Sequence, residues 1–232
     1  MRLKWLMGYS VALCLLLIII SQSIIFPTFH MAFFRWQYDR LNVAETVQME
    51  QDELMRVTTD LLDYMRGRRD SLEDVYAIVA GQERRFFSDI EIRHMIDVLH
   101  LYNVAFMIRN IAFFLLVALV LGMVLAKHDV LRVLSRCVRE VLAGFLVLTA
   151  ITVILISLDF DHAFNIFHRI FFNNDYWILD PSVDLLINLV PLEFFIHISI
   201  YIGGLILFAC TAFITAASLY LYNSPDITLY KS

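Results

Sequence analysis

The run VAFMIRNIAFFLLVALVLGMVLA, from Val104 to Ala126, decides the fold class of this chain. A helix needs about 20 apolar residues to cross the ~30 Å hydrocarbon core of a bilayer, and this run is long enough. Its apolar residues are continuous rather than alternating, which indicates a helix and not a strand of a transmembrane barrel. Three similar runs occur elsewhere, so the sequence predicts four spans, at about 5–26, 104–126, 141–158 and 195–221.

The composition agrees with a membrane protein. The chain is 60% hydrophobic and 18% charged, and its mean hydropathy is +0.70. A soluble domain of this length is far less apolar. We therefore predict an all-α polytopic protein with four transmembrane helices, forming a single membrane domain over residues 1–232.

The charges of the connecting segments predict the orientation. Segment 127–139 carries four basic residues against one acid, whereas segment 159–193 carries one basic residue against six acids. Short loops rich in Lys and Arg stay in the cytoplasm. We expect both termini in the cytoplasm, an extracellular helical cap at 28–103, and an extracellular loop at 159–193. In the cap, Leu54, Val57, Leu61 and Met65 recur at helical spacing and predict an amphipathic helix.

A polar cluster, SDIEIRHMIDVLHLYN from Ser88 to Asn103, precedes the second span. Its first residues form a capping-box pattern, in which Ser88 and Glu91 satisfy each other's backbone amides at a helix start. On that helix His94 and Asp97 share a face, because residues three apart are neighbours. A carboxylate beside an imidazole fixes its tautomer and raises its basicity, so the two residues are a candidate reactive pair.

A second cluster, FNIFHRIFFNNDYWILDPSVDLLINLVPLEFF from Phe164 to Phe195, combines aromatic residues with a histidine and several carboxylates. A plain connecting loop does not need this mixture. Within it, Asp180 before Pro181 is typical of an N-cap followed by proline at the first helical position. The pattern predicts a short helix at 181–189, too short to span and therefore re-entrant or interfacial.

Other motifs in the sequence leave several interpretations open. We interpret the isolated His30, His100 and His128 as interfacial anchors. No HExxH or CxxC zinc motif and no GxSxG nucleophile motif is present, although a metal bound by His94, His168 and a carboxylate remains an alternative. Arg109 lies inside the second predicted span, where it either snorkels or meets a lipid-borne anion.

The segments EIRHMIDVLHLYN and FFNNDYWILDPSVDLLINLVPLEFF, in this order and in a four-span frame, resemble the lipoprotein intramolecular transacylase (Lit) family of Gram-positive bacteria. The resemblance implies movement of the sn-2 acyl chain of a diacylated lipoprotein to the α-amine of its N-terminal cysteine, giving a lyso-form lipoprotein. It implies two functional histidines, which match His94 in EIRHMIDV and His168 in FHRIFF. His162 is close enough to be the alternative to the second.

We expect His94 to be the general base, oriented by Asp97, and His168 to protonate the leaving oxygen or stabilise the oxyanion. The expected substrate-binding residues are Arg169, Arg109, His162 and Trp177. No cofactor, metal or nucleic acid is predicted. The expected partners are diacylated lipoproteins and membrane lipid. We expect the active site at the outer face of the bacterial cell membrane. Two other functions stay open at this point: a non-enzymatic membrane protein that binds a partner or lipid, and a metal-dependent membrane hydrolase.

Overall fold

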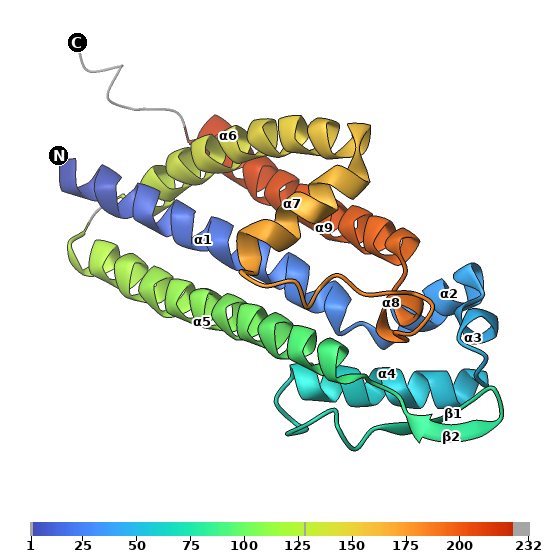
Figure 1. Ribbon diagram of the computed structural model, residues 1–232. Coiled ribbons are helices and arrows are strands. Elements are labelled where there is room, and N and C mark those ends of the chain that lie inside the picture. The colour runs from blue at the N-terminus through green and yellow to red at the C-terminus, as the bar shows by residue number, and fades with distance from the viewer. Residues whose placement is uncertain (1, 128, 225–232) are drawn as a thin grey trace, which may run out of the picture. The chain divides into compact units, whose positions relative to one another are not determined.

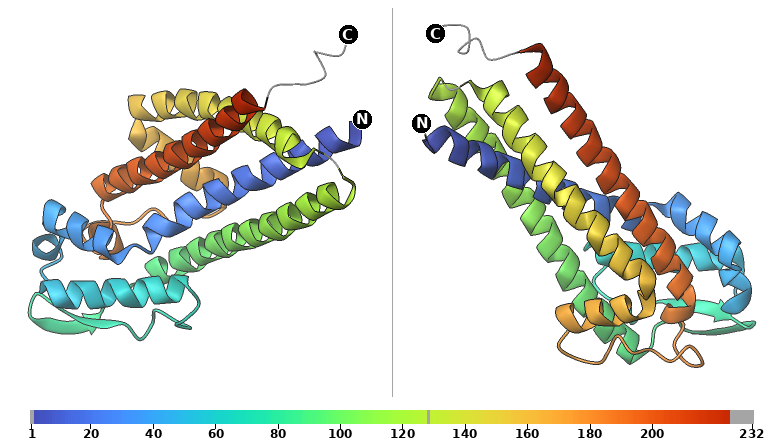
Figure 2. Two further views of the ribbon diagram at one scale, coloured as in Figure 1. Left: turned by 180° about the vertical axis from the view of Figure 1, so that it is seen from behind. Right: turned by 90° about the horizontal axis from the view of Figure 1, so that it is seen from above.

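The computed structural model describes residues 2–127 and 129–224, so His128 lies outside the described residues. Four long helices dominate the chain (Figure 1). Each is long and apolar enough to cross a membrane, and each continues without interruption in the further views of Figure 2. They are α1 (Arg2–Thr28), α5 (Asp89–Leu125), α6 (Val130–Leu158) and α9 (Leu192–Asn223). The prediction of an all-α protein with four transmembrane helices is confirmed.

Two compact units make up the fold. The helical unit comprises the described parts of residues 1–24, 105–158 and 202–232, and the cap unit comprises residues 25–104 and 159–201. The helical unit has a small apolar core shared by its four helix segments. The buried residues of this core are Val11, Ala12, Ile19, Met123, Val133, Cys137, Val138, Leu142, Ile206 and Cys210.

Close packing in the helical unit depends on Gly8. A Cβ atom at this position would lie 2.7 Å from Val133 Cγ1 and 2.8 Å from Cys137 Sγ. Small residues allow membrane helices to approach, since lipid provides no hydrophobic drive between them. Gly8 therefore lets α1 approach α6 more closely than any larger residue would allow.

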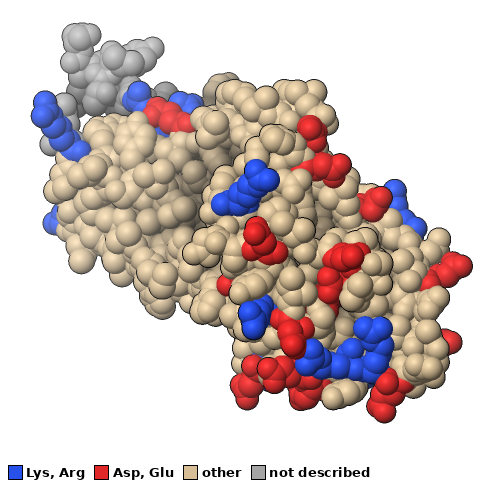
Figure 3. Space-filling view, viewed as in Figure 1, with Lys and Arg blue, Asp and Glu red and all other residues tan. Residues whose placement is uncertain are grey.

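Large apolar side chains cover the outside of the helical unit. Phe114 on α5 is 70% exposed and Val147 on α6 is 65% exposed. Such exposure is costly in water and ordinary in contact with lipid tails. On the face shown in Figure 3 most charged residues gather over one part, a smaller group lies elsewhere, and a broad area carries none.

The cap unit contains the shorter elements as well as the beginning of α5 and of α9. Its helices α2, α3 and α4 form the segment after α1, and α7 and α8 lie between α6 and α9. A two-stranded antiparallel hairpin, β1 with β2, follows α4. The bounds are α2 Met31–Leu41, α3 Val43–Thr46, α4 Gln51–Met65, β1 Tyr76–Val79, β2 Gln82–Arg85, α7 Phe160–Phe171 and α8 Leu186–Leu189.

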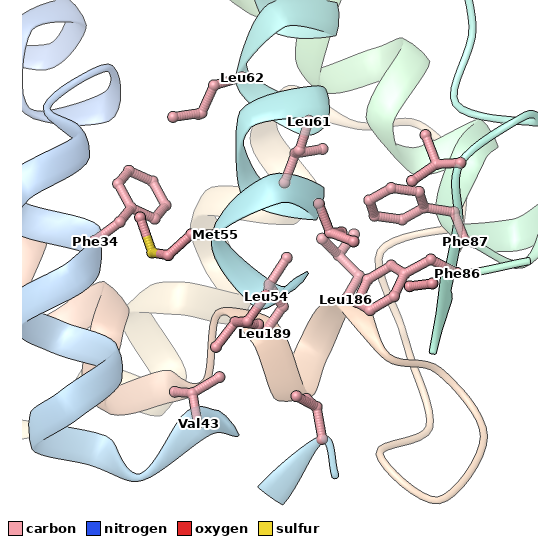
Figure 4. Packing of buried hydrophobic residues seen from close by; sticks show 14 of the residues in the cluster. Phe34, Val43, Leu54, Met55, Leu61, Leu62, Phe86, Phe87, Leu186 and Leu189 are labelled. Carbon is pink, nitrogen blue, oxygen red and sulfur yellow. The ribbon is translucent and has the colours of Figure 1, made fainter. Parts of the chain in front are cut away.

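Helix α4 supplies the centre of the cap core, as its apolar spacing predicts. Leu54, Val57, Leu61 and Met65 are all buried. Figure 4 shows Leu54 and Leu61 packed among phenylalanines from the segment after β2 and leucines of α8. The cap core therefore joins segment 25–104 to segment 159–201, and this places residues of the second cluster beside residues of the first.

The hairpin is a feature that the sequence reasoning did not predict. Ala80 and Gly81 form its two-residue turn, and both have positive φ, 53° and 79°. Such turns match the twist of the paired strands. Along the other edge of β1, Arg56 of α4 donates to the Tyr76 carbonyl, and Ile78 N–H donates to the carboxylate of Glu53 at 3.3 Å. Side chains of α4 thus satisfy backbone groups of a strand edge that would otherwise be open.

The predicted helix at 181–189 is wrong in its start. Helix α8 begins only at Leu186, and the residues before it form a turn. Asp180 does cap, but it caps that turn: the backbone N–H and the hydroxyl of Ser182 donate to its carboxylate at 2.9 and 2.7 Å. The Asp-Pro signal therefore marks a capped turn rather than the first turn of the helix.

Candidate functional site

The capping box at the start of α5 forms as predicted. Ser88 N–H donates to the carboxylate of Glu91, and Glu91 N–H donates to Ser88 Oγ at 3.4 Å. These bonds satisfy backbone donors that a helix start leaves unpaired. His94 follows Glu91 by three residues, so it stands on a helical turn whose position is fixed.

Two buried carboxylates tie this helix start to the loop before α8. The second carboxylate oxygen of Glu91, which is 1% exposed, accepts from Leu186 N–H. Asp184, which is 6% exposed, accepts from Ser88 Oγ at 2.9 Å and from Asp180 N–H at 2.9 Å. We call Glu91, Ser88 and Asp184 the carboxylate latch. The latch therefore ties segment 25–104 of the cap unit to segment 159–201 by hydrogen bonds to carboxylates, which are stronger than bonds between neutral groups when the acid is ionised.

Helix α7 supplies the second histidine. It begins at an N-cap, where the Asp159 carboxylate accepts from His162 N–H at 2.9 Å. About two and a half turns after this N-cap His168 is buried, and its Nδ1 lies 2.7 Å from the carbonyl oxygen of Phe164. A carbonyl only accepts, so Nδ1 carries the proton of that bond. The neutral ring of His168 therefore has its lone pair on Nε2.

The fold brings the two histidines together. The ring centroids of His94 and His168 are 6.1 Å apart. Aromatic rings surround the pair: Trp177 stacks on His168 with centroids 4.7 Å apart and planes 25° apart, and Phe172 meets His94 edge-on at 5.4 Å. The ring centroids of Phe164 and His168 are 4.1 Å apart. The pair thus has an apolar wall of aromatic side chains, which strengthens the electrostatic interactions of any polar group between them.

The surroundings of the pair favour neutral imidazoles. Burial lowers the pKa of His168 below its ordinary value, and the hydrogen bond to the Phe164 carbonyl opposes part of that effect. His94 has a buried Nδ1 with no hydrogen-bond partner among the described residues. A group bound beside His94 would therefore meet a polar atom that the protein itself does not satisfy.

Asp97 does not hold His94 in the predicted way. Its carboxylate accepts from Asn174 Nδ2 at 2.8 Å, and the described residues show no hydrogen bond between Asp97 and His94. The backbone carbonyl of Asn174 in turn accepts from Trp177 Nε1 at 3.0 Å. Asn174 therefore connects the helix of one histidine to the indole that stacks on the other. Sequence reasoning missed Asn174, although a polar Asn-Asn-Asp step inside an aromatic segment was a visible signal.

The remaining predicted residues lie at different places. His162 and Arg169 are exposed on α7, so neither joins the pair of His94 and His168. Arg109 belongs to the helical unit, where it stacks on Phe106 at 5.4 Å and bonds Asn110 at 3.0 Å. Within residues 2–127 and 129–224, no group of three His, Cys, Asp or Glu side chains is placed to hold a metal ion.

Comparisons with known proteins give a family and a fold. The family model for lipoprotein intramolecular transacylase Lit matches residues 9–195. Among curated proteins, none matches this chain by sequence.

Solved structures of the membrane integral lipoprotein intramolecular transacylase Lit from Bacillus cereus share the fold. One aligns with a TM-score of 0.75 at 20% identity and covers 96% of this chain and 99% of that one. Two others carry a single histidine replaced by alanine or by arginine. They align with TM-scores of 0.74 and 0.70 at 19% and 21% identity, each over 96% of this chain and over 95% and 92% of their own.

These structures establish the four-helix membrane fold, and the family match extends over most of the chain and includes both histidines. The chain belongs to the lipoprotein intramolecular transacylase (Lit) family.

Proposed function

We propose that His94 and His168 are the acid–base pair with which this chain performs the reaction of its family. As a Lit member the chain is an acyltransferase that acts on lipoproteins, moving the sn-2 acyl chain of the S-diacylglyceryl group to the α-amine of the N-terminal cysteine. The observation that supports the assignment is the 6.1 Å separation of two histidine rings, from two distant segments, inside an aromatic wall.

The reaction needs proton transfers and no enzyme nucleophile. The α-ammonium loses a proton, the free amine attacks the ester carbonyl, and a tetrahedral intermediate forms. The nitrogen then loses a second proton while the carbon–oxygen bond to the glyceryl group breaks. One proton goes to the departing oxygen, so the net products are an amide, a free hydroxyl and one proton released. Since donor and acceptor belong to one molecule, holding them together supplies much of the rate.

The geometry supports the reverse of the allocation expected from the sequence. His168 is the better base, because its Nδ1 proton is committed to the Phe164 carbonyl and its Nε2 lone pair is free to accept. A lowered pKa keeps this ring neutral and ready at physiological pH. Burial lowers the pKa of His94 to about 4, so this ring is also neutral and acts through its ring N–H, which donates a hydrogen bond to the oxyanion and the leaving oxygen.

Mass spectrometry of lipoprotein N-termini tests the function. Diacylated lipoproteins in membranes that contain this protein are expected to convert to the lyso form with an amide-linked acyl chain. Membranes with the His94→Ala, His168→Ala double variant at matched expression serve as control. Persistence of diacylglyceryl termini with the unaltered protein would contradict the function, and conversion by the double variant would contradict the site.

We further propose that both termini lie in the cytoplasm and that the cap unit, with its histidine pair, faces the outside. The charge distribution of the loops supports this orientation. In intact cells an impermeant thiol reagent is expected to label Asp70→Cys and to spare Leu131→Cys. Both positions are exposed in the structure, so burial does not explain a difference. The opposite labelling pattern would reverse the orientation.

A further inference from the structure

Helix α7 has an apolar stripe that no part of the cap unit covers. Ile166, Phe167, Ile170 and Phe171 are 44%, 44%, 71% and 52% exposed. Residues three and four apart share a helix face, so these four side chains form one continuous stripe along α7. The opposite face is polar, with Asp161, His162, Asn165 and Arg169.

The course of the chain indicates what covers this stripe. Helix α6, one of the four spans, ends at Leu158, and Asp159 is the only residue before α7 begins. Helix α7 therefore starts where a membrane span ends. A helix with one apolar face and one charged face lies in the plane of the interface, with its apolar face about 5–10 Å into the headgroup and acyl boundary.

His168 occupies a particular place on this helix. At 3.6 residues per turn, it falls at the border between the apolar stripe and the polar face, next to Phe164. It is the buried residue of α7, whereas its neighbours on the stripe are exposed. When the stripe rests in the acyl region, the imidazole therefore stands at the level of the headgroup boundary, where the ester carbonyls of a membrane lipid lie.

We infer that the exposed stripe of α7 is a lipid-binding surface that rests in the outer leaflet and sets the height of His168 at the lipid ester. The part of this inference that concerns the ester rests on the proposed function. The contact with lipid does not. A second copy of the chain is the other occupant that such a stripe could have, and the experiment below separates the two.

Two positions on α7 provide a matched pair for the test. In a variant whose native cysteines are replaced by alanine, Ile170→Cys places a thiol on the stripe and Asn165→Cys places one on the polar face of the same helix. Both residues are exposed in the structure. In sealed membranes an impermeant maleimide is expected to label position 165 on the order of tenfold faster than position 170, because the reactive thiolate is suppressed in an apolar layer. Detergent should remove the difference.

A second measurement reports the lipid directly. A fluorophore attached at position 170, in vesicles of phosphatidylcholine with brominated acyl chains, is expected to be quenched more strongly than the same fluorophore at position 165. Equal labelling and equal quenching at the two positions would overturn the inference. So would an efficient disulfide between two copies at position 170 together with weak quenching by lipid. If the protein performs no acyl transfer while the labelling and quenching differ between the two positions as expected, the proposed function is wrong and the lipid-binding surface is still supported.

Discussion

Replacement of Asn174 by alanine is expected to slow acyl transfer by about one to two powers of ten while the protein stays folded. The Asn174 side chain donates to Asp97 on α5 at 2.8 Å and accepts from Tyr176 N–H at 3.1 Å. The same residue's backbone accepts from Trp177, whose ring stacks on His168. Removal of the amide therefore detaches this segment from Asp97 on α5 and leaves the backbone bond to Trp177 in place.

The magnitude follows from the lost bonds. A hydrogen bond to a charged group contributes about 1.5–3 kcal/mol net. Each 1.36 kcal/mol of lost transition-state stabilisation slows a reaction about tenfold. If the bond between Asn174 and Asp97 serves to align the pair, its loss corresponds to a rate roughly 10- to 100-fold lower, with a smaller change in substrate affinity.

Exchange of the two partners provides the decisive control. Asp97→Asn removes the negative charge that strengthens the bond, and Asn174→Asp removes the donor and sets two carboxylates against each other. The double variant restores one amide and one carboxylate in exchanged places. The assay is the initial rate of lyso-lipoprotein formation, followed by mass spectrometry at saturating substrate. We expect the double variant to recover at least part of the rate. A double-mutant cycle of the four rates gives the coupling energy between positions 97 and 174.

Two results would refute this reasoning. If Asn174→Ala converts substrate at the wild-type rate, the link between the helices does not position the histidines. If the exchanged pair is as slow as Asp97→Asn alone, the negative charge beside His94 is what matters, and the role expected for Asp97 from the sequence is the better one.

Three other outcomes are expected. His94→Ala and His168→Ala each lower the conversion rate about 10²-fold or more, a usual acid–base contribution, whereas the exposed His162→Ala stays near wild type; the reverse order for the last two would move the site to His162. Since burial lowers the pKa of His168 and the base must be unprotonated, the rate at saturating substrate falls as the pH decreases only below about 6.5, and a fall already complete above that pH contradicts the assignment. Gly8→Ala lowers the thermal midpoint in detergent because its Cβ would lie 2.7 Å from a methyl group of α6, at a cost of about 1–3 kcal/mol, whereas Gly144→Ala, which meets nothing within 4 Å, does not.

The long-range architecture could be predicted because membrane spans are local signals. A continuous apolar run such as Val104–Ala126 needs no tertiary partner to identify it. The capping box at Ser88 and the apolar face of α4 are also local, and both are present in the structure. The hairpin was not predictable in this way, because Ala80 and Gly81 are not a typical Asn-Gly turn and β2 is largely charged.

The candidate site shows the same division between local and distant information. Spacing along a helix correctly places His94 and Asp97 one turn apart, but it cannot reveal that Asn174 is the partner of Asp97. The start of α8 was missed for a related reason. Asp184 has its hydrogen bonds to Ser88 and to the backbone of Asp180, and only the folded cap unit reveals them. In both cases the deciding partner lies far away in the sequence.

The carboxylate latch has a consequence for how the enzyme is assembled in the membrane. Glu91 precedes its partner Leu186 by two membrane spans, so the early segment is made long before the group that satisfies one of its oxygens. Until the segment that contains Leu186 has been synthesised, the Glu91 carboxylate has to remain hydrated. The helical turn that carries His94 therefore cannot become buried. A truncated or stalled chain therefore has no aromatic enclosure and no reactive pair. We therefore expect activity only in a protein whose segment 159–201 has been synthesised and has packed against the start of α5.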